Sequence, residues 1–115
     1  MKETSKLEIR NIVRVGLREL KKFDEADPKS LIYLQQAGNK MYKAYTHLLE
    51  RISGRNIRTP KGVSAVTYEM KDKSFIPLFK QVRYLHSFYY EGDGEMTVRE
   101  VKESAKEINR LLGKY

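Results

Sequence analysis

Hydrophobic residues recur at intervals of three and four along most of the chain, which is the spacing of one face of an α-helix. A first helix is predicted from Ser5 to Phe23, and Glu8 gives its start the spacing of a capping box. The clearest helix begins at Asp27-Pro28, an N-cap followed by a first-turn proline, and stops at Gly54. Its apolar stripe consists of Leu31, Leu34, Gly38, Met41, Tyr45, Leu48 and Ile52.

The pattern lapses from Arg55 to Asp72. The stretch GRNIRTPKG, residues 54–62, reads as a loop because of its Gly, Asn and Thr-Pro content. The following VSAVTYEM, residues 63–70, is compatible with a short helix or with an extended segment. The sequence leaves these two alternatives open.

A third helix is predicted from Ser74 to Tyr90, with Pro77 in its first turn. The Gly-Asp-Gly of residues 92–94 then ends the helical pattern. A fourth helix is predicted to begin at Thr97, where a glutamate three residues later completes a capping box, and to end at Gly113. No strand-like alternation of any length occurs. Residues 1–115 are therefore predicted to form one all-α domain, a four-helix antiparallel up-and-down bundle.

The composition shows a strongly positive chain and excludes sites that require cysteine. The 115 residues contain no cysteine and carry a formal net charge of +8. Such a charge attracts polyanions, of which nucleic acid is the usual one, although it also serves solubility. No apolar run approaches the roughly 20 residues of a membrane span, and no signal peptide is visible at the N-terminus. We expect a soluble, cytoplasmic protein with no membrane partner.

Motifs of metabolic enzymes are missing. The two histidines lack HxxxH or HExxH spacing, so no metal site is predicted. The seven glycines form neither a phosphate-binding loop nor a dinucleotide fingerprint, and no GxSxG elbow occurs. No cofactor is therefore expected.

Basic residues form two clusters that have the charge to neutralise phosphates. A ridge along the first helix, with residues four apart, consists of Lys6, Arg10, Arg14, Arg18 and Lys22. A second cluster, at the end of the second helix and in the following loop, consists of Arg51, Arg55, Arg58 and Lys61. Each is also compatible with a solvated face that keeps a small protein in solution.

His86 lies in the aromatic stretch LHSFYYEG, residues 85–92. Antiparallel packing of the second and third helices is expected to bring the Tyr42 region towards His86. Three roles stay open for His86: a structural one at the edge of the core, bonded to a tyrosine hydroxyl or a backbone carbonyl; contact with RNA or a nucleotide; and catalysis. Tyr45 and Tyr89 are expected in the core or at its rim, and His47 at the surface.

Apolar residues outside the main stripes predict self-association as a two-fold homodimer. On the first helix these are Leu7, Val15 and Leu17, and on the second they are Ile32, Tyr42 and Leu49.

Two motifs resemble those of a known family. The run AGNKMYKAYTHLL, residues 37–49, and the later LHSFYYEG, with the pair Leu78-Phe79 between them, are similar to the archaeal PaREP-type family, in or near the HEPN superfamily of small helical bundles. The matching residues are Ala37, Lys40, Tyr42, Lys43, Ala44, Leu48, Leu85, His86, Phe88, Tyr89 or Tyr90, and Gly92. The resemblance implies a dimerising four-helix bundle associated with nucleic acid or nucleotides, of a defence or toxin–antitoxin type, with a protein partner encoded nearby.

Many members of that superfamily are ribonucleases that use an Arg and a His four to six residues apart. Here only two residues separate Arg83 from His86, and Lys80 stands at the expected distance. A lysine lacks the bidentate guanidinium fork. The predicted function is therefore a nucleic-acid- or nucleotide-associated protein with little or no catalysis. The alternatives are a ribonuclease that uses His86 with Lys80 or Arg83, and a purely structural or protein-interaction bundle.

Overall fold

The computed structural model describes residues 5–86 and 94–115, with side chains in the second segment described from Thr97 onward. The helices, in chain order, are α1 (Lys6–Lys21), α2 (Leu31–Ser53), α3 (Pro60–Glu69), α4 (Phe75–His86) and α5 (Gly94–Lys114), and a 3₁₀ turn (Pro28–Ser30) precedes α2. These residues contain no strand. The all-α prediction is confirmed, but the described chain has five α-helices where four were predicted.

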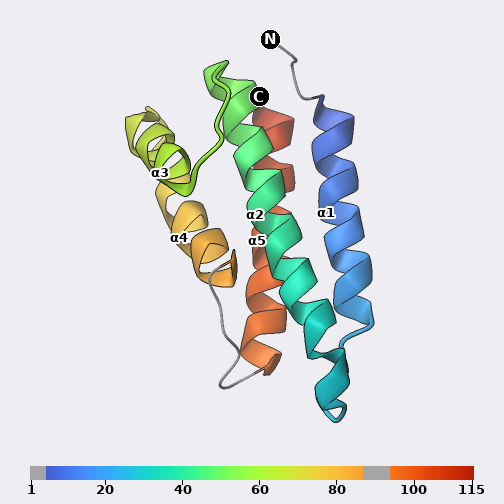
Figure 1. The fold of residues 1–115 in the computed structure, drawn as a ribbon. Helices are drawn as coiled ribbons and strands as arrows, with labels where there is room; N and C mark the ends of the chain where they lie inside the picture. Colours follow the sequence, from blue (N-terminus) through green and yellow to red (C-terminus); the bar gives the residue numbers. More distant parts are fainter. Residues whose placement is uncertain (1–4, 87–93) are drawn as a thin grey trace.

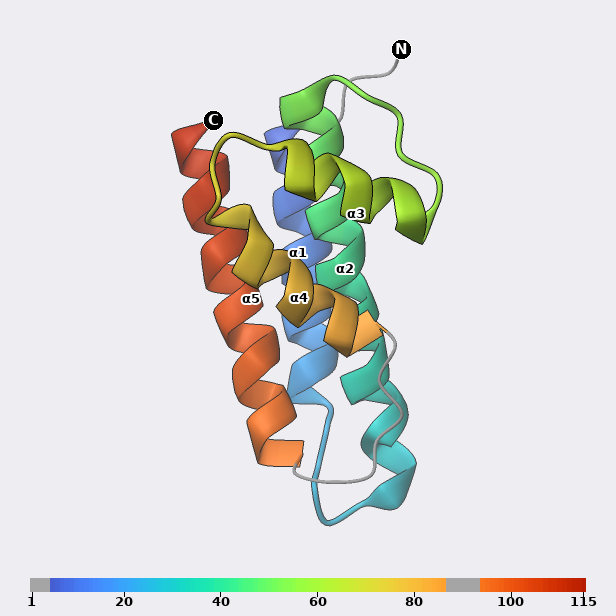
Figure 2. The same cartoon turned by 90° about the vertical axis from the view of Figure 1, so that its left-hand side faces the viewer.

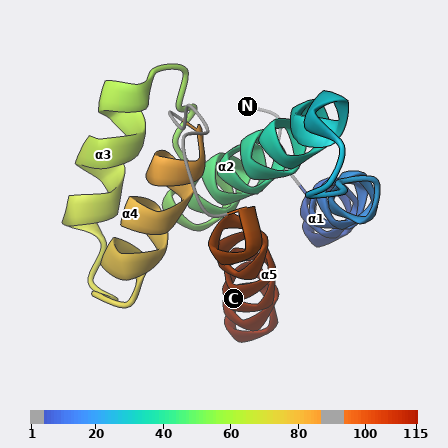
Figure 3. The ribbon, with the colours of Figure 1, turned by 90° about the horizontal axis from the view of Figure 1, so that it is seen from below.

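Helix α2 lies at the centre of the molecule and contacts α1, α3, α4 and α5. Helix α5 also packs against α1 and α4. Figure 1 shows that α1 and α2 run in opposite directions, as do α2 and α4, and that α5 lies behind α2. Seen from below, α1 lies on one side of α2, and the pair α3 and α4 lies on the other (Figure 3). No helix of the described residues is long and apolar enough to cross a membrane.

The helix ends follow local signals where a cap is present. Ser5 accepts a hydrogen bond from the Glu8 backbone N–H at 3.1 Å, as the capping-box spacing predicted. Asp27 caps the 3₁₀ turn before α2 through the Lys29 N–H, and Gly54 ends α2 with φ of +72°. That left-handed conformation favours glycine.

Helix α3 is the main departure from the predicted fold. The Thr-Pro pair assigned to a loop is the start of a helix: Thr59 accepts the Gly62 N–H at 3.0 Å, and Pro60 occupies the first turn. Of the two alternatives for the segment after residue 62, the helix is correct. Figure 2 shows α3 lying across α2 rather than along it. The predicted loop therefore shortens to residues 54–59.

The two ends of α5 differ from the predictions. Helix α5 begins at Gly94, three residues before the predicted N-cap, so that Thr97 is buried inside the helix. Gly113 does not end α5, which continues to Lys114. Helix α4 spans Phe75–His86, and residues 87–93 lie outside the described part of the chain. The predicted end of this helix at Tyr90 and the predicted place of Tyr89 therefore stay predictions.

A buried hydrogen bond joins α3 to the centre of the core. Tyr45 is fully buried, and its hydroxyl lies 2.6 Å from Thr67 Oγ1. The backbone carbonyls of Val63 and Phe75 are further acceptors beside this pair, at 2.8 Å from the Thr67 hydroxyl and 3.4 Å from the Tyr45 hydroxyl. Burial raises the pKa of Tyr45 far above its ordinary value. The prediction that Tyr45 belongs to the core is confirmed.

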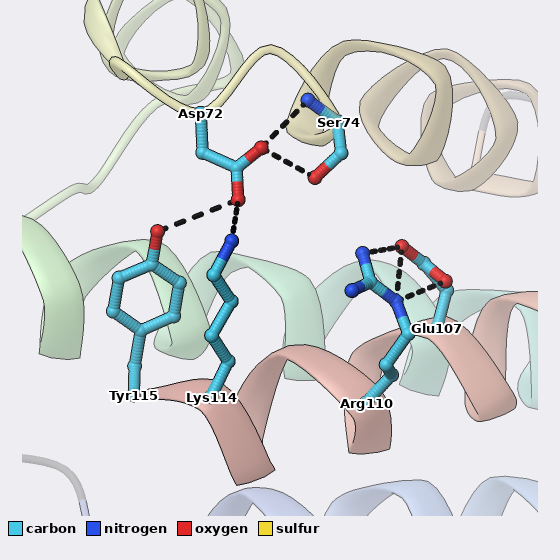
Figure 4. Close-up of polar contacts among 6 residues, drawn as sticks. All are labelled: Asp72, Ser74, Glu107, Arg110, Lys114 and Tyr115. Carbon is cyan, nitrogen blue, oxygen red and sulfur yellow. Dashed lines mark hydrogen bonds and ion pairs between the residues drawn. The ribbon is translucent and has the colours of Figure 1, made fainter.

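Asp72 ties the turn between α3 and α4 to the end of α5 (Figure 4). One carboxylate oxygen accepts the Ser74 backbone N–H at 3.0 Å and the Ser74 hydroxyl at 2.6 Å, and the other accepts the Lys114 ammonium at 3.0 Å. The hydrogen bonds from Ser74, followed by that from Lys114, hold the pKa of Asp72 well below its usual range.

This depressed pKa predicts a loss of stability in acid. Because the carboxylate is stabilised in the folded state, its contribution is present above the unfolded pKa of about 3.9 and is lost as the pH falls below it. We expect Asp72→Asn to lower the midpoint of thermal unfolding at pH 6 and the difference from the unmodified protein to shrink towards pH 2. Glu25→Gln, at an exposed carboxylate, is the control. A difference that stays constant with pH would contradict the assigned role.

Candidate functional site

A pocket of about 450 Å³ lies where α2, α3 and α4 meet. It is lined by Tyr42 from α2, by Pro60, Lys61 and Ser64 from α3, and by Phe79, Arg83 and His86 from α4. The three α4 residues are separated by four and then three positions, so they share one helical face. Phe79 is buried and forms the apolar base of this face, while Arg83 and His86 are exposed.

His86 stacks on Tyr42 at one wall of the pocket. The ring centroids are 4.1 Å apart and the planes differ by 15°. The prediction that α2 brings Tyr42 towards His86 is therefore confirmed. Within the described residues the hydrogen-bond partner differs from the predicted tyrosine hydroxyl or backbone carbonyl: His86 Nδ1 lies 3.2 Å from the side-chain oxygen of Asn39. Asn39 precedes Tyr42 by one turn of α2, which places both beside the same ring.

The Asn39 contact defines which nitrogen of His86 faces a ligand. An amide oxygen only accepts hydrogen bonds, so Nδ1 carries the proton in this contact. In the neutral ring Nε2 is then an acceptor, and in the protonated ring it is a donor. The imidazole is thus held by stacking on one face and by a hydrogen bond on one edge, while its side chain remains exposed.

The charge of the lining residues is positive. Lys61 and Arg83 approach the pocket from different helices, and no carboxylate is among the lining residues that the structure describes. Burial raises the pKa of Tyr42 above its ordinary value, and the nearby Arg83 guanidinium offsets part of this rise. Pro60 and Lys61 belong to the first turn of α3, whose helix dipole adds positive potential at the same place. The arrangement suits an anion next to a flat ring.

The structure separates the catalytic candidates. Arg83 and His86 line the same pocket, whereas Lys80 is exposed on α4 and does not line it. Lys80 lies one position after Phe79, which places it about 100° further around the helix and about 120° from His86. Of the two predicted partners for His86, only Arg83 is brought to the same site.

The structure gives the four residues of the loop cluster different surroundings. Arg55 forms an ion pair with Glu69 of α3 at 2.5 Å, and Arg58 lies beside the side-chain amide of Asn56. Arg51, in the last turn of α2, has interactions of its own, and Lys61 alone of the four lines the pocket.

The loop of residues 54–59 is anchored by Glu50, and this anchor also involves His47. The Glu50 carboxylate accepts the Ile57 N–H at 3.1 Å and lies 2.7 Å from His47 Nδ1. His47, predicted at the surface, is half-buried because of this pairing.

The ridge on α1 is a separate surface. Arg10, Arg14 and Arg18 are exposed, and none of them has an ion-pair partner within residues 5–86 and 97–115. Helix α1 packs on α2 and α5 but contacts neither α3 nor α4. A ligand in the pocket therefore does not reach the ridge without crossing α2.

The apolar residues that predicted a homodimer are partly used inside one chain. Leu49 is fully buried, Tyr42 lies against His86, and Val15 and Leu17 are half-buried. Leu7 and Ile32 remain exposed, at 65% and 52% of their surface. The premise that one chain leaves both sets uncovered is wrong for Leu49 and holds for Leu7 and Ile32, while the other three residues are partly covered.

Comparison of the chain with family models, with curated proteins and with solved structures found no match. The site is therefore interpreted from its geometry. Sequence reasoning missed Asn39, Ser64 and Phe79 among the residues at the pocket. The spacing of Phe79, Arg83 and His86 in the sequence was sufficient to predict that they share one helical face. The sequence did not predict that α3 contributes residues to the pocket. In the described part no His, Asp and Glu side chains gather in a group that would hold a metal ion.

Proposed function

We propose that the protein binds RNA or a nucleotide through the pocket between α2, α3 and α4, and that it is a nucleic-acid-associated protein. One observation carries this proposal: two cations from different helices line a pocket that also contains the stacked Tyr42–His86 pair, with no lining carboxylate in the described chain. Phosphates are neutralised by such cations, and aromatic rings beside cations are the stacking platforms of single-stranded nucleic acids. Contacts of this kind read the backbone and not the base sequence.

The family assignment is also a proposal. We propose that α1, α2, α4 and α5 correspond to a HEPN-like four-helix bundle and that α3 is an added element, in a protein of the archaeal PaREP type with a defence or toxin–antitoxin role. In support, residues 37–49 lie on α2, His86 ends α4, and the two motifs meet at the stacked rings. A homodimer and a protein partner encoded nearby belong to this proposal. Exposed Leu7 and Ile32 support the homodimer.

The test is the salt dependence of RNA binding. Fluorescence anisotropy of a labelled, short single-stranded RNA should show saturable binding that weakens as salt increases. Arg83→Gln should lower the log–log slope by about 0.7 for each phosphate that it leaves without a cation, and it should weaken all sequences alike. Arg18→Gln, which removes the same charge from the α1 ridge, is the matched control and should leave the slope unchanged. If the two substitutions had equal effects, RNA binding would depend on the general charge of the protein and not on the pocket. Absence of binding would favour a structural or protein-interaction role.

A ribonuclease is the second candidate function, favoured by the presence of Arg83 and His86 at one pocket. His86 Nε2 is the nitrogen available for proton transfer, because Nδ1 is bonded to Asn39. Cleavage in the same RNA samples, abolished in His86→Ala and kept in His47→Ala, would establish this activity. Intact RNA throughout would leave binding alone.

A further inference from the structure

A second cavity, of about 550 Å³, lies between α1 and α5, away from α3 and α4. Its apolar lining comes from Leu17 and Leu20 of α1 and Phe23 just after it on one side, and from Val98 and Ala105 of α5 on the other. Leu20 and Ala105 are buried, and Leu17, Phe23 and Val98 are half-buried. The floor of this cleft is therefore hydrophobic, and its volume is within the range of small-molecule sites, about 300–1,000 Å³.

The rim of the cleft is cationic. Lys21 from α1 and Lys102 and Lys106 from α5 line it, together with Asn109, and all four side chains are exposed. No acidic residue lines the cleft among those that the structure describes. Arg14 extends the positive charge along α1, because it shares a helical face with Leu17 and Lys21. An apolar floor below lysines on both walls is complementary to a molecule with an apolar chain and a negatively charged head.

We infer that the cleft between α1 and α5 binds a single-chain anionic amphiphile, of the chemical class of medium-chain carboxylates. The chain would lie on Leu17, Leu20 and Val98, and the carboxylate would be bound by the lysine ammonium groups. The size of the cleft favours this ligand over a protein segment. Nine of the described residues, between Leu17 and Phe23 and between Val98 and Asn109, line it, whereas specific protein interfaces bury about 800 Å² on each partner and involve about 20–30 residues. This inference does not depend on RNA binding at the other pocket.

The experiment compares decanoate with decanol, which has the same chain and no charge, by calorimetric titration below the micelle-forming concentration. Decanoate should bind saturably with one site per chain and about tenfold more tightly than decanol, as expected for a head group held by several cations. Amide and methyl NMR shifts should map to Leu17, Val98 and Ala105. Equal affinity for the two compounds, or shifts elsewhere, would overturn the inference.

The double variant Lys102→Glu, Lys106→Glu should weaken decanoate binding about tenfold or more, since it replaces attraction by repulsion, and should leave decanol binding unchanged. Its matched control is Lys29→Glu, Lys71→Glu, which changes the net charge equally at exposed lysines outside the cleft. Equally weakened binding in both variants would overturn the site. Absence of decanoate binding would show that the lysine stems only cover apolar surface.

Two further arms separate other occupants. Vesicles of phosphatidylglycerol should bind equally to the Lys102/Lys106 variant and to the Lys29/Lys71 variant of the same net charge, since the cleft takes a free chain. Clearly weaker vesicle binding by the Lys102/Lys106 variant would identify a membrane surface instead. An acidic amphipathic peptide should fail to displace bound decanoate. If the peptide binds the cleft and decanoate does not bind, the inference is overturned. Arg83→Gln should leave decanoate binding unchanged, which keeps this test separate from that of RNA binding.

Discussion

Replacement of Gly16 by leucine is expected to lower the free energy of unfolding by about 3 kcal/mol or more, and in a domain of this size such a decrease leaves a large unfolded population. Gly16 is buried where α1 crosses α2. A Cβ atom built on it would lie 2.5 Å from Met41 Cε and 2.9 Å from Lys40 Cβ, closer than side-chain carbons approach in folded proteins. A leucine adds three more carbons to this contact, so α1 has to move away from α2.

A graded series separates this clash from the removal of glycine itself. Alanine at an exposed helix position gains about 1 kcal/mol over glycine from helix propensity. Gly16→Ala should nevertheless destabilise, because Lys40 Cβ is fixed to the α2 backbone even if the Met41 methyl rotates. Gly113→Ala in α5 is the matched control, since a Cβ there meets nothing within 4 Å and should add stability. Urea unfolding followed by circular dichroism measures all three variants. Stabilisation by Gly16→Ala would contradict the close approach of α1 and α2.

A second glycine connects this packing to the pocket. A Cβ on Gly38 would lie 3.1 Å from the Leu85 carbonyl oxygen, so α2 and α4 approach closely at this point. Asn39 and His86 are the next residues of the two helices, and their hydrogen bond forms beside this contact. Gly38 thus sets the helix separation at which the imidazole reaches both Asn39 and Tyr42. The candidate site therefore depends on Gly38, because a residue without a side chain lets the backbones of α2 and α4 approach closely.

Periodicity was sufficient to predict the long helices because each buries one continuous apolar face. It was insufficient for α3, which spans ten residues and buries only Val63, Val66 and Thr67. The Thr-Pro pair before it is typical both of loops and of helix starts, and only packing on α2 and α4 decides between them. The approach of Tyr42 to His86 was predictable from antiparallel helices, whereas the bond to Asn39 was not. That bond depends on the rotation of α2 about its axis relative to α4.

The same missing helix changes how the residues of the loop cluster are arranged. Arg55, Arg58 and Lys61 are close in sequence, which suggested one phosphate-binding surface. Once α3 forms, Glu69 at its far end pairs with Arg55, while Lys61 in its first turn lines the pocket together with Arg83. The charge clusters along the sequence therefore predicted that the surface is positive. They did not predict which of the cationic residues share one site, because tertiary contacts determine that.

Reversal of the two pocket cations is expected to abolish RNA binding at physiological salt. In Lys61→Glu, Arg83→Glu each substitution removes an attraction for phosphate and adds a repulsion, so we expect affinity to fall by about 100-fold, which corresponds to about 2.7 kcal/mol. Lys29→Glu, Lys71→Glu is the matched control, because it lowers the net charge of +8 equally at lysines outside the pocket. It should weaken binding only slightly, through the general field of the protein. Circular dichroism would verify that both variants remain helical. If the affinity of both variants fell by the same factor, net charge alone would account for binding, and the pocket between α2, α3 and α4 would have no special role in it.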